Sequence, residues 1–277
     1  MHRKWGAWAA VLTLGLFAPA SAPRLGAKEQ KAVRQTNGTS EVRYSGGGKV
    51  QLVGVSYSPS DGQHWWNAQG APISYAPSRP KSKSPLLAHG DEKARDFVFR
   101  CLGIPNNATV QITAPQSHSF DRWVTFQSRR PSALGIAATF PSSLHAVSIR
   151  VGVAGKPWKT IADVAPSSGA GLRFITRPWG ARSITLGVSP PSQFNNSVGF
   201  TLSNTNVGAD YQSRFAAVDR QGRLHPGVKL AGELSGRMYT QTISFQGMQI
   251  ADVQKIVFQT RAYEWREFKN ISLEPKS

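Results

Sequence analysis

The residues best suited to catalysis lie near the end of the chain, where charged and aromatic side chains crowd together. A glycoside hydrolase needs two carboxylates that flank the bond it cleaves, and Glu264 and Glu267 are the pair that this stretch offers. Three positions apart on a strand, they point to opposite faces. Arg261, Arg266 and Lys269 surround them and favour ionised, salt-bridged carboxylates. That environment suits a structural role, so a hydrolase of unrecognised type using Glu264 or Glu267 is the alternative hypothesis.

Aromatic rings next to arginines form a second kind of candidate site, one that binds a ligand without changing it. Exposed rings stack on sugars, and guanidinium groups bind anions. The candidate residues are Trp65, Trp66, Arg177, Trp179, Arg261, Tyr263 and Trp265. The alternative is that these rings fill the core and the arginines cover them by cation–π contact. Adjacent strand residues point to opposite faces, so one ring of the Trp65–Trp66 pair is expected in the core and the other at the surface.

The sequence lacks the motifs of metal, nucleophile and nucleotide chemistry. Its six histidines stand far apart, without a His-x-His pair. It contains no Gly-x-Ser-x-Gly turn, no P-loop and no dinucleotide fingerprint. The single cysteine, Cys101, lies in a strand-like run and is interpreted as a small buried hydrophobic residue. We therefore expect no metal and no cofactor, and the sequence favours a protein without catalytic activity over an enzyme.

The start of the chain indicates export. A basic segment, His2–Lys4, precedes an apolar run from Trp5 to Ala20, and small residues at Leu25–Ala27 offer a cleavage site. Residues 1–27 are therefore predicted to be a signal peptide and the protein to be periplasmic or extracellular. An uncleaved anchor is the alternative, although the run is short for a membrane span of about 20 residues.

The chain is strongly basic, with 33 Lys and Arg against 15 Asp and Glu. Removing Arg3, Lys4 and Arg24 with the signal peptide leaves 30 against 15, a formal charge of +15. Such an excess favours an anionic neighbour. For an exported protein we expect an envelope glycan, an anionic polymer or a protein partner, and export argues against nucleic acid. A solvated basic surface is the simpler explanation of the same charge.

Short alternating runs separated by Gly, Pro, Asn and Ser predict an all-β protein, an antiparallel β-sandwich. Residues 28–48 are predicted to be a flexible leader, and residues 49–277 one large sandwich or two similar small ones, divided near 165–170. The expected strands are Lys49–Tyr57, Asp96–Leu102, Thr109–Thr113, Trp123–Ser128, Leu134–Phe140, His145–Val153, Trp158–Val164, Leu172–Thr176, Ser183–Val188, Val198–Ser203, Arg214–Asp219 and Arg237–Phe245. Gln193–Asn206 and Gly222–Gly236 are expected to be mobile connections, and Ile250–Val253 one helical turn.

The segment Val253–Pro275 is predicted to close the fold as a hairpin, with a bulge near Lys269–Asn270. The spacing of Phe, Thr, Arg and aromatic residues from Phe258 to Phe268 recurs, 84 residues earlier, from Phe174 to Ile184. A repeated hairpin would place both phenylalanines in the core. A chance match in a chain rich in Arg and aromatic residues is the alternative.

The closing segment also resembles a known bacterial module, and the resemblance extends over most of the chain. The matching stretches are Phe258–Leu273, Val50–Ser56, Val151–Thr160 and Ala216–Gly222. They are similar to the exported β-rich module that follows membrane segments in antirepressor-type metalloproteases related to β-lactam sensors, and that occurs in stand-alone exported proteins. The chain has Ala262 where the module usually has Pro, and it has no His-Glu-x-x-His protease motif. The resemblance therefore implies an extracytoplasmic accessory module without an assigned activity.

Overall fold

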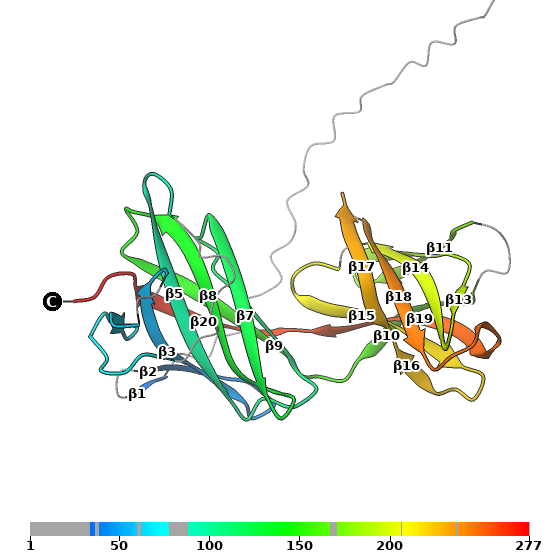
Figure 1. The fold of residues 1–277 in the computed structure, drawn as a ribbon, viewed down its shortest axis with the longest axis horizontal. Helices are drawn as coiled ribbons and strands as arrows, with labels where there is room; N and C mark the ends of the chain where they lie inside the picture. The colour runs from blue at the N-terminus through cyan, green and yellow to red at the C-terminus, as the bar shows by residue number, and fades with distance from the viewer. Residues whose placement is uncertain are drawn as a thin grey trace, which may run out of the picture. The chain divides into compact units, whose positions relative to one another are not determined.

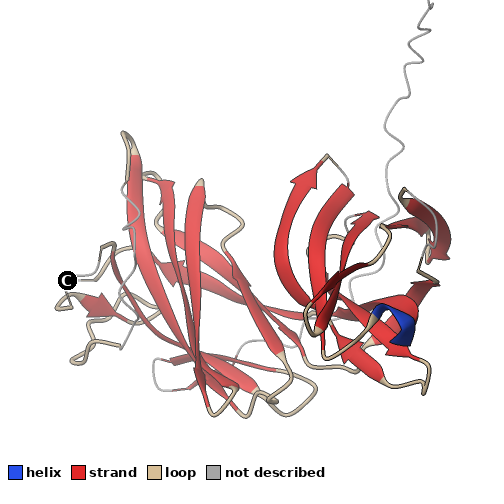
Figure 2. Ribbon diagram, turned by 45° about the vertical axis from the view of Figure 1, so that its right-hand side comes forward, coloured by secondary structure: helices blue, strands red, loops and turns tan. Residues whose placement is uncertain are grey.

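The protein is built almost entirely of antiparallel β-strands, as the computed structural model shows (Figure 2). It describes residues 34–36, 39–59, 62–77, 88–166, 171–205, 207–236 and 238–276. The predicted all-β sandwich is confirmed. The predicted helical turn is a short 3₁₀ helix, Ile250–Asp252. The predicted signal peptide lies outside the described residues.

Two sheets enclose a first core. Sheet A has the strand order β1-β2-β3-β5-β8-β7, with β4 paired to β3, and sheet B has the order β20-β9-β6 (Figure 1). The strands of sheet A are β1 (Arg34–Thr36), β2 (Thr39–Arg43), β3 (Lys49–Tyr57), β4 (Trp65–Trp66), β5 (Glu92–Leu102), β7 (Ser119–Gln127) and β8 (Arg130–Pro141). Those of sheet B are β6 (Thr109–Thr113), β9 (Ala146–Ala154) and β20 (Glu264–Ser272). Alternate residues such as Phe97, Phe99 and Phe268 are fully buried between the sheets, as the period of a strand requires.

Two further sheets enclose a second core. Sheet C has the order β10-β19-β15-β16, and sheet D has the order β11-β12-β14-β18-β17, with β13 paired to β14. The strands of sheet C are β10 (Lys159–Val164), β15 (Tyr211–Asp219), β16 (Leu224–Pro226) and β19 (Val253–Ala262). Those of sheet D are β11 (Arg173–Trp179), β12 (Arg182–Val188), β13 (Ser192–Phe194), β14 (Ser197–Thr205), β17 (Val228–Ser235) and β18 (Met238–Gln246). Phe200, Phe215, Phe245 and Phe258 fill this core.

The predicted closing hairpin is wrong, because its two strands belong to different sheets. β19 pairs with β10 and β15, whereas β20 pairs with β9. A single residue, Tyr263, separates the two strands, which is too short a connection for a tight turn between paired strands. The chain thus runs straight on from the second core into the first. The predicted bulge is confirmed, since the register shifts between Phe268 and Ile271 and Asn270 has a positive φ of 54°.

Several segments predicted to be irregular are ordered strands. β2 and Tyr44 lie within the predicted leader, yet β2 pairs with β3, Val42 is buried, and the Tyr44 hydroxyl donates to the carbonyl oxygen of Val151 at 3.0 Å. β17 lies within a predicted mobile connection. Every residue of β17 is exposed, so the strand lacks the alternation that marks a half-buried strand. β10 already pairs in sheet C before residue 165, so the second core begins upstream of residues 165–170.

The proposed repeat does not describe one structure used twice. Phe258 is fully buried in the second core, whereas Phe174 is 54% exposed on the outer side of sheet D. β11 and β12 form a true hairpin around Gly180, which has a positive φ of 59°. The stretch after Phe258 forms no hairpin at all. The expectation that both phenylalanines lie in the core is therefore wrong.

The end of the chain is fastened to sheet A by one buried arginine. Arg95 on β5 is 6% exposed, and its Nε donates to the carbonyl oxygen of Leu273 at 2.6 Å. Its Nη2 donates to both carboxylate oxygens of Glu274, at 2.9 and 3.0 Å. Trp66 adds a hydrogen bond from Nε1 to the carbonyl oxygen of Ser272 at 3.0 Å. These contacts hold β20 in the first sandwich.

We predict that Arg95→Ala lowers the free energy of unfolding by about 2–3 kcal/mol, because charge-assisted hydrogen bonds are lost and a buried carbonyl oxygen is left without its donor. Urea denaturation followed by far-UV circular dichroism measures the change. The matched control is Arg100→Ala on the same strand, where the side chain is exposed and the change should stay within about 0.5 kcal/mol. Equal destabilisation by the two substitutions would contradict the anchoring role.

Candidate functional site

Trp65 and Trp66 point to opposite faces of sheet A, as expected, but both rings are buried. Trp66 is 1% exposed and lies in the first core. Trp65 is 3% exposed and lies over Gly54, where a Cβ atom would come within 3.0 Å of its ring, of Ile73 and of Pro77. The expectation of an exposed ring is therefore wrong, because the segment after β4 folds back over Trp65.

Arg261 joins a stack of two guanidinium groups on one indole. Its guanidinium carbon lies 4.3 Å from the centre of the Trp158 ring, and that of Arg214 lies at the same distance. Nε of Arg261 donates to Gln212 at 2.7 Å. Burial lowers the pKa of both arginines. Nη1 of Arg261 has no hydrogen-bond partner among the described residues, but it is fully enclosed, so the stack is packing rather than an open ligand site.

The other predicted aromatic residues lie in ring contacts at strand ends. Trp179 meets Tyr211 edge-on at a centroid distance of 4.7 Å. Tyr263 and Trp265 lie 5.5 Å apart, and the guanidinium carbon of Arg150 lies 5.0 Å from the Trp265 ring. Cation–π contact with Trp265 was one of the two interpretations of the sequence, and the structure supports it. Arg177 is exposed on β11.

The two candidate catalytic carboxylates are held in ion pairs and point to opposite faces. Glu264 accepts hydrogen bonds from the backbone N–H and the hydroxyl of Ser45, and it pairs with Arg266. Glu267 lies 3.6 Å from the ammonium group of Lys269. The register of β20 against β9 places Glu264 on the side of Phe268 and Glu267 on the other side. They cannot flank one glycosidic bond.

Among the described carboxylates, Asp219 at the turn after β15 has a pKa well below its ordinary value. Its oxygens accept from the N–H groups of Gln221 and Arg223, from the Arg223 side chain at 2.7 Å and from Nε2 of His225 at 2.9 Å. Burial alone would raise its pKa, but the hydrogen bonds from His225 and Arg223 outweigh burial and lower the pKa. An ionised acceptor saturated with donors stabilises the turn and is a poor general base.

The described residues also offer no metal site and no reactive thiol. No group of three or more His, Cys, Asp and Glu residues that could hold a metal ion occurs in the described part of the chain. Burial raises the pKa of the Cys101 thiol to about 12, so the thiolate is absent at neutral pH, in agreement with the interpretation of Cys101 as a buried hydrophobic residue.

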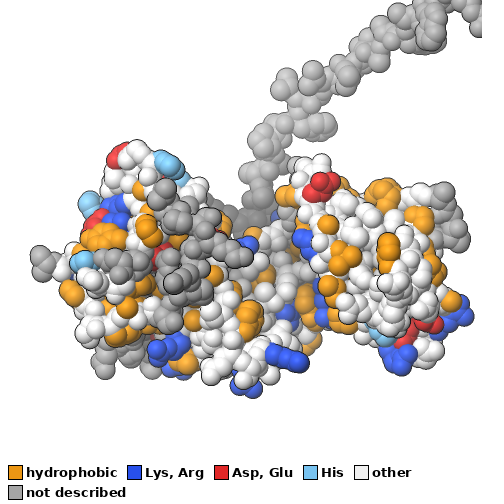
Figure 3. Space-filling view, in the orientation of Figure 1, with side chains coloured by type: hydrophobic (Ala, Val, Ile, Leu, Met, Phe, Trp, Pro, Cys, Tyr) orange, Lys and Arg blue, Asp and Glu red, His pale blue; other side chains and the backbone are white. Residues whose placement is uncertain are grey.

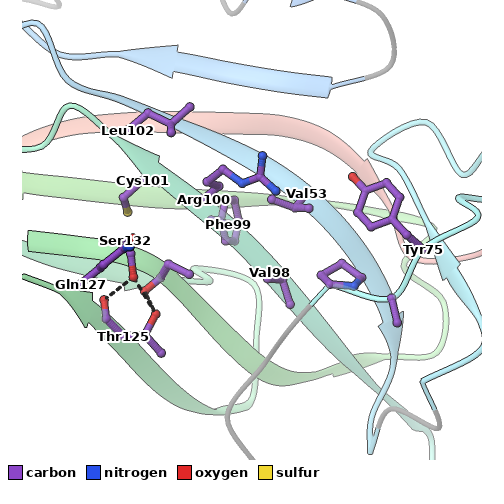
Figure 4. A pocket seen from close by; sticks show the side chains of 13 residues that line it. Val53, Tyr75, Val98, Phe99, Arg100, Cys101, Leu102, Thr125, Gln127 and Ser132 are labelled. Carbon is purple, nitrogen blue, oxygen red and sulfur yellow. Dashed lines mark hydrogen bonds between the residues drawn. The ribbon is translucent and has the colours of Figure 1, made fainter.

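The outer face of sheet A contains a hollow of about 680 Å³, which we call the sheet A hollow. Its floor is formed by β3, β5, β7 and β8, and the segment Tyr75–Pro77 forms one wall (Figure 4). The described residues that line it are Val53, Tyr75, Ala76, Pro77, Val98, Phe99, Arg100, Cys101, Leu102, Thr125, Gln127, Ser132 and Ala133. Its size falls within the usual range of small-molecule sites.

The chemistry of the sheet A hollow is that of a binding site with one cation. Arg100 is exposed, and no acidic side chain is among the described residues that line the hollow. Tyr75 presents a 51% exposed phenol ring. The hydroxyl groups of Thr125 and Ser132 lie 3.2 Å apart, joined by a dashed line in Figure 4. The hollow therefore combines an apolar floor with a guanidinium group, a phenol and two hydroxyl groups. This combination suits a ligand that carries both an anionic group and hydroxyl groups.

Sequence reasoning missed the sheet A hollow, although part of its signal was present. Phe97 and Phe99 mark the buried side of β5, and strand alternation then places Val98 and Arg100 on the other side. The sequence does not show that Tyr75 and Gln127, 52 residues apart, stand at the same face. That juxtaposition depends on the pairing of β3 with β5, of β5 with β8, and of β8 with β7.

Comparisons with known proteins do not place this chain in a family. No family model matches it, and no curated protein matches it either. Among solved structures, the chain is similar to the crystal structure of the conserved domain protein from Bacillus anthracis, with 8% identity and a TM-score of 0.25 over 89% of this chain and 91% of that one. A likeness at that level carries no argument about fold or function. Among the described residues there is no helix that is long and apolar enough to cross a membrane.

We predict that Asp219→Asn lowers the thermal unfolding midpoint at pH 7 and that the difference from the wild type closes in acid. The folded pKa of Asp219 lies below its ordinary value of 3.8. Its stabilising effect is therefore complete above pH 3.8 and is lost as the pH falls through the folded pKa. Midpoints measured from pH 7 to as far below pH 3.8 as both proteins remain folded test this. A difference that stays constant across the range would show that the charge of Asp219 has no part in the turn.

Proposed function

We propose that this chain is a non-catalytic extracytoplasmic binding module of the bacterial cell envelope and that it holds an anionic, hydroxyl-bearing ligand in the sheet A hollow. The observation that carries the proposal is the hollow itself, a concave sheet face with one exposed guanidinium and no acidic side chain among its described lining residues. The sequence favours three classes of ligand: an envelope glycan, an anionic polymer or a protein. Of these, the lining of the hollow favours an acidic glycan.

Export and the family resemblance support the same proposal. The basic segment and apolar run at the start of the chain are typical of a signal peptide. The stretches shared with the exported module of antirepressor-type metalloproteases extend along most of the chain. In that module the protease part is separate, so a binding or sensing role fits a chain that carries the accessory part without it.

A hydrolase that uses Glu264 or Glu267 is not favoured. Each of these carboxylates is occupied by a nearby cation, and the two point to opposite faces of β20. Neither residue lines the sheet A hollow. Retaining and inverting glycosidases both need two carboxyl groups that converge on one bond, which these strand positions do not provide.

The test is a binding titration of residues 28–277 with acidic oligosaccharides, using oligogalacturonate and hyaluronan fragments, and with their uncharged reduced analogues. We expect Arg100→Ala to weaken binding of an acidic fragment about 10-fold, since one charge-assisted hydrogen-bonding group is worth roughly 1.5 kcal/mol. Tyr75→Ala should weaken it by a smaller factor. Isothermal titration calorimetry measures both.

The matched control is Arg177→Ala, which removes an exposed arginine from β11 in the second sandwich. If Arg100→Ala and Arg177→Ala weaken binding equally, or if all binding collapses together between low and moderate salt, the interaction is one of general charge. Either result would contradict a site in the sheet A hollow.

A further inference from the structure

The outer face of sheet D is made of hydroxyl-bearing residues. In β12, β14 and β18 the alternate residues Leu186, Leu202 and Ile243 point into the second core. Their neighbours on the other side are threonines and serines, apart from Gly187, and cross-strand pairing brings these residues into rows. Two of the resulting pairs are hydrogen-bonded, Thr176 to Thr185 at 3.0 Å and Ser203 to Thr240 at 2.9 Å. We call this surface the sheet D face.

Two phenylalanine rings lie on the sheet D face, each over a glycine. A Cβ atom on Gly187 would come within 2.6 Å of the Phe174 ring, and one on Gly199 within 3.0 Å of the Phe194 ring. The rings are nevertheless 54% and 59% exposed. They thus lie along the sheet with one side packed and the other open. Gly187 pairs with Ser203, four residues from Gly199 on β14, so the two positions are about 13 Å apart along the strand.

The sheet D face carries almost no charge, although the chain has 33 Lys and Arg residues. Among the described residues of this face, the one charged side chain is that of Glu233, on the edge strand β17 opposite Thr240. Figure 3 shows this region, over β14 and β18, as mostly white with separate hydrophobic patches and few charged side chains. A face without cations has no electrostatic attraction for an acidic polymer or an anionic membrane surface.

We propose that the sheet D face binds an uncharged polysaccharide chain, with Phe174 and Phe194 each stacked against a sugar ring. The rings offer flat apolar surface where a pyranose presents its C–H groups. The threonine and serine rows between them provide hydrogen-bond donors and acceptors for sugar hydroxyls. Hydroxyl groups separate the two rings, so the rings do not form one apolar centre of the kind that a stable protein partner buries. The other large exposed apolar side chains of this sheet, such as Leu230 and Leu234, lie on its edge strand β17.

The sheet D face differs in charge and place from the sheet A hollow, so the two binding activities are separable. A neutral ligand makes no ion pairs, and its affinity for the sheet D face should not change between low and high salt. An acidic ligand in the hollow should bind more weakly as salt rises. Arg100→Ala should therefore leave binding at the sheet D face unchanged, even if no ligand is found for the hollow.

Calorimetric titration of residues 28–277 with cellohexaose and with the hexamer of N-acetylglucosamine tests the proposal. We expect at least one of them to bind with a salt-independent Kd. Phe174→Ala and Phe194→Ala should each weaken binding about 10-fold, given roughly 1.4 kcal/mol for a lost stacking contact. Thr242→Lys, which adds a long charged side chain to the middle of the face without removing an aromatic ring, should weaken binding as well.

The matched control is Phe126→Ala, which removes a phenylalanine that is 63% exposed on β7 in the first sandwich. Unfolding curves should show that every variant is folded at the titration temperature. The proposal is overturned if neither hexamer binds the wild type. It is equally overturned if Phe174→Ala and Phe194→Ala bind as tightly as Phe126→Ala does.

Discussion

Both cores depend on one uninterrupted run of chain, from β19 through Tyr263 to β20. β19 is an inner strand of sheet C, between β10 and β15, and β20 completes sheet B beside β9. The second sandwich is in effect an insertion between β9 and β20, which are separated by about 110 residues. The pairing of β20 with β9 is therefore a long-range contact, and it must offset the entropy of closing the loop between the two strands. The contacts of Arg95 and Trp66 with the last residues therefore matter more than ordinary surface bonds would.

Aromatic rings over glycines recur on the outer faces of these sheets. The pairs are Trp65 with Gly54, Trp123 with Gly135, Trp265 with Gly152, Phe174 with Gly187, and Phe194 with Gly199. A glycine in a strand has no side chain to pack, and a neighbouring ring restores the missing contact. Two of the five rings predicted to contact a ligand, Trp65 and Trp265, are explained in this way. Phe174 and Phe194 differ because more than half of each side chain is exposed.

Sequence pattern predicted the buried strands well and the partners of those strands poorly. Lys49–Tyr57 and Thr109–Thr113 have the predicted bounds because their alternation reflects a buried face. β17 was missed because none of its residues is buried. The separation of β19 from β20 was missed because alternation describes each strand but not its neighbour. For the same reason the sheet A hollow, formed where Tyr75 meets the face of β5, could not be seen.

Some of the basic residues that give this chain its formal charge are buried or stacked in the structure. Arg95 and Arg261 are buried, and Arg214 is stacked with Arg261 on Trp158. These guanidinium groups hold strands together and are not available to a polyanion at the surface. Meanwhile the sheet D face carries almost no charge among its described residues. The formal charge therefore includes at least these three guanidinium groups that serve packing. For the proposed charged ligand, the position that matters is Arg100, the one basic residue among the described lining residues of the sheet A hollow.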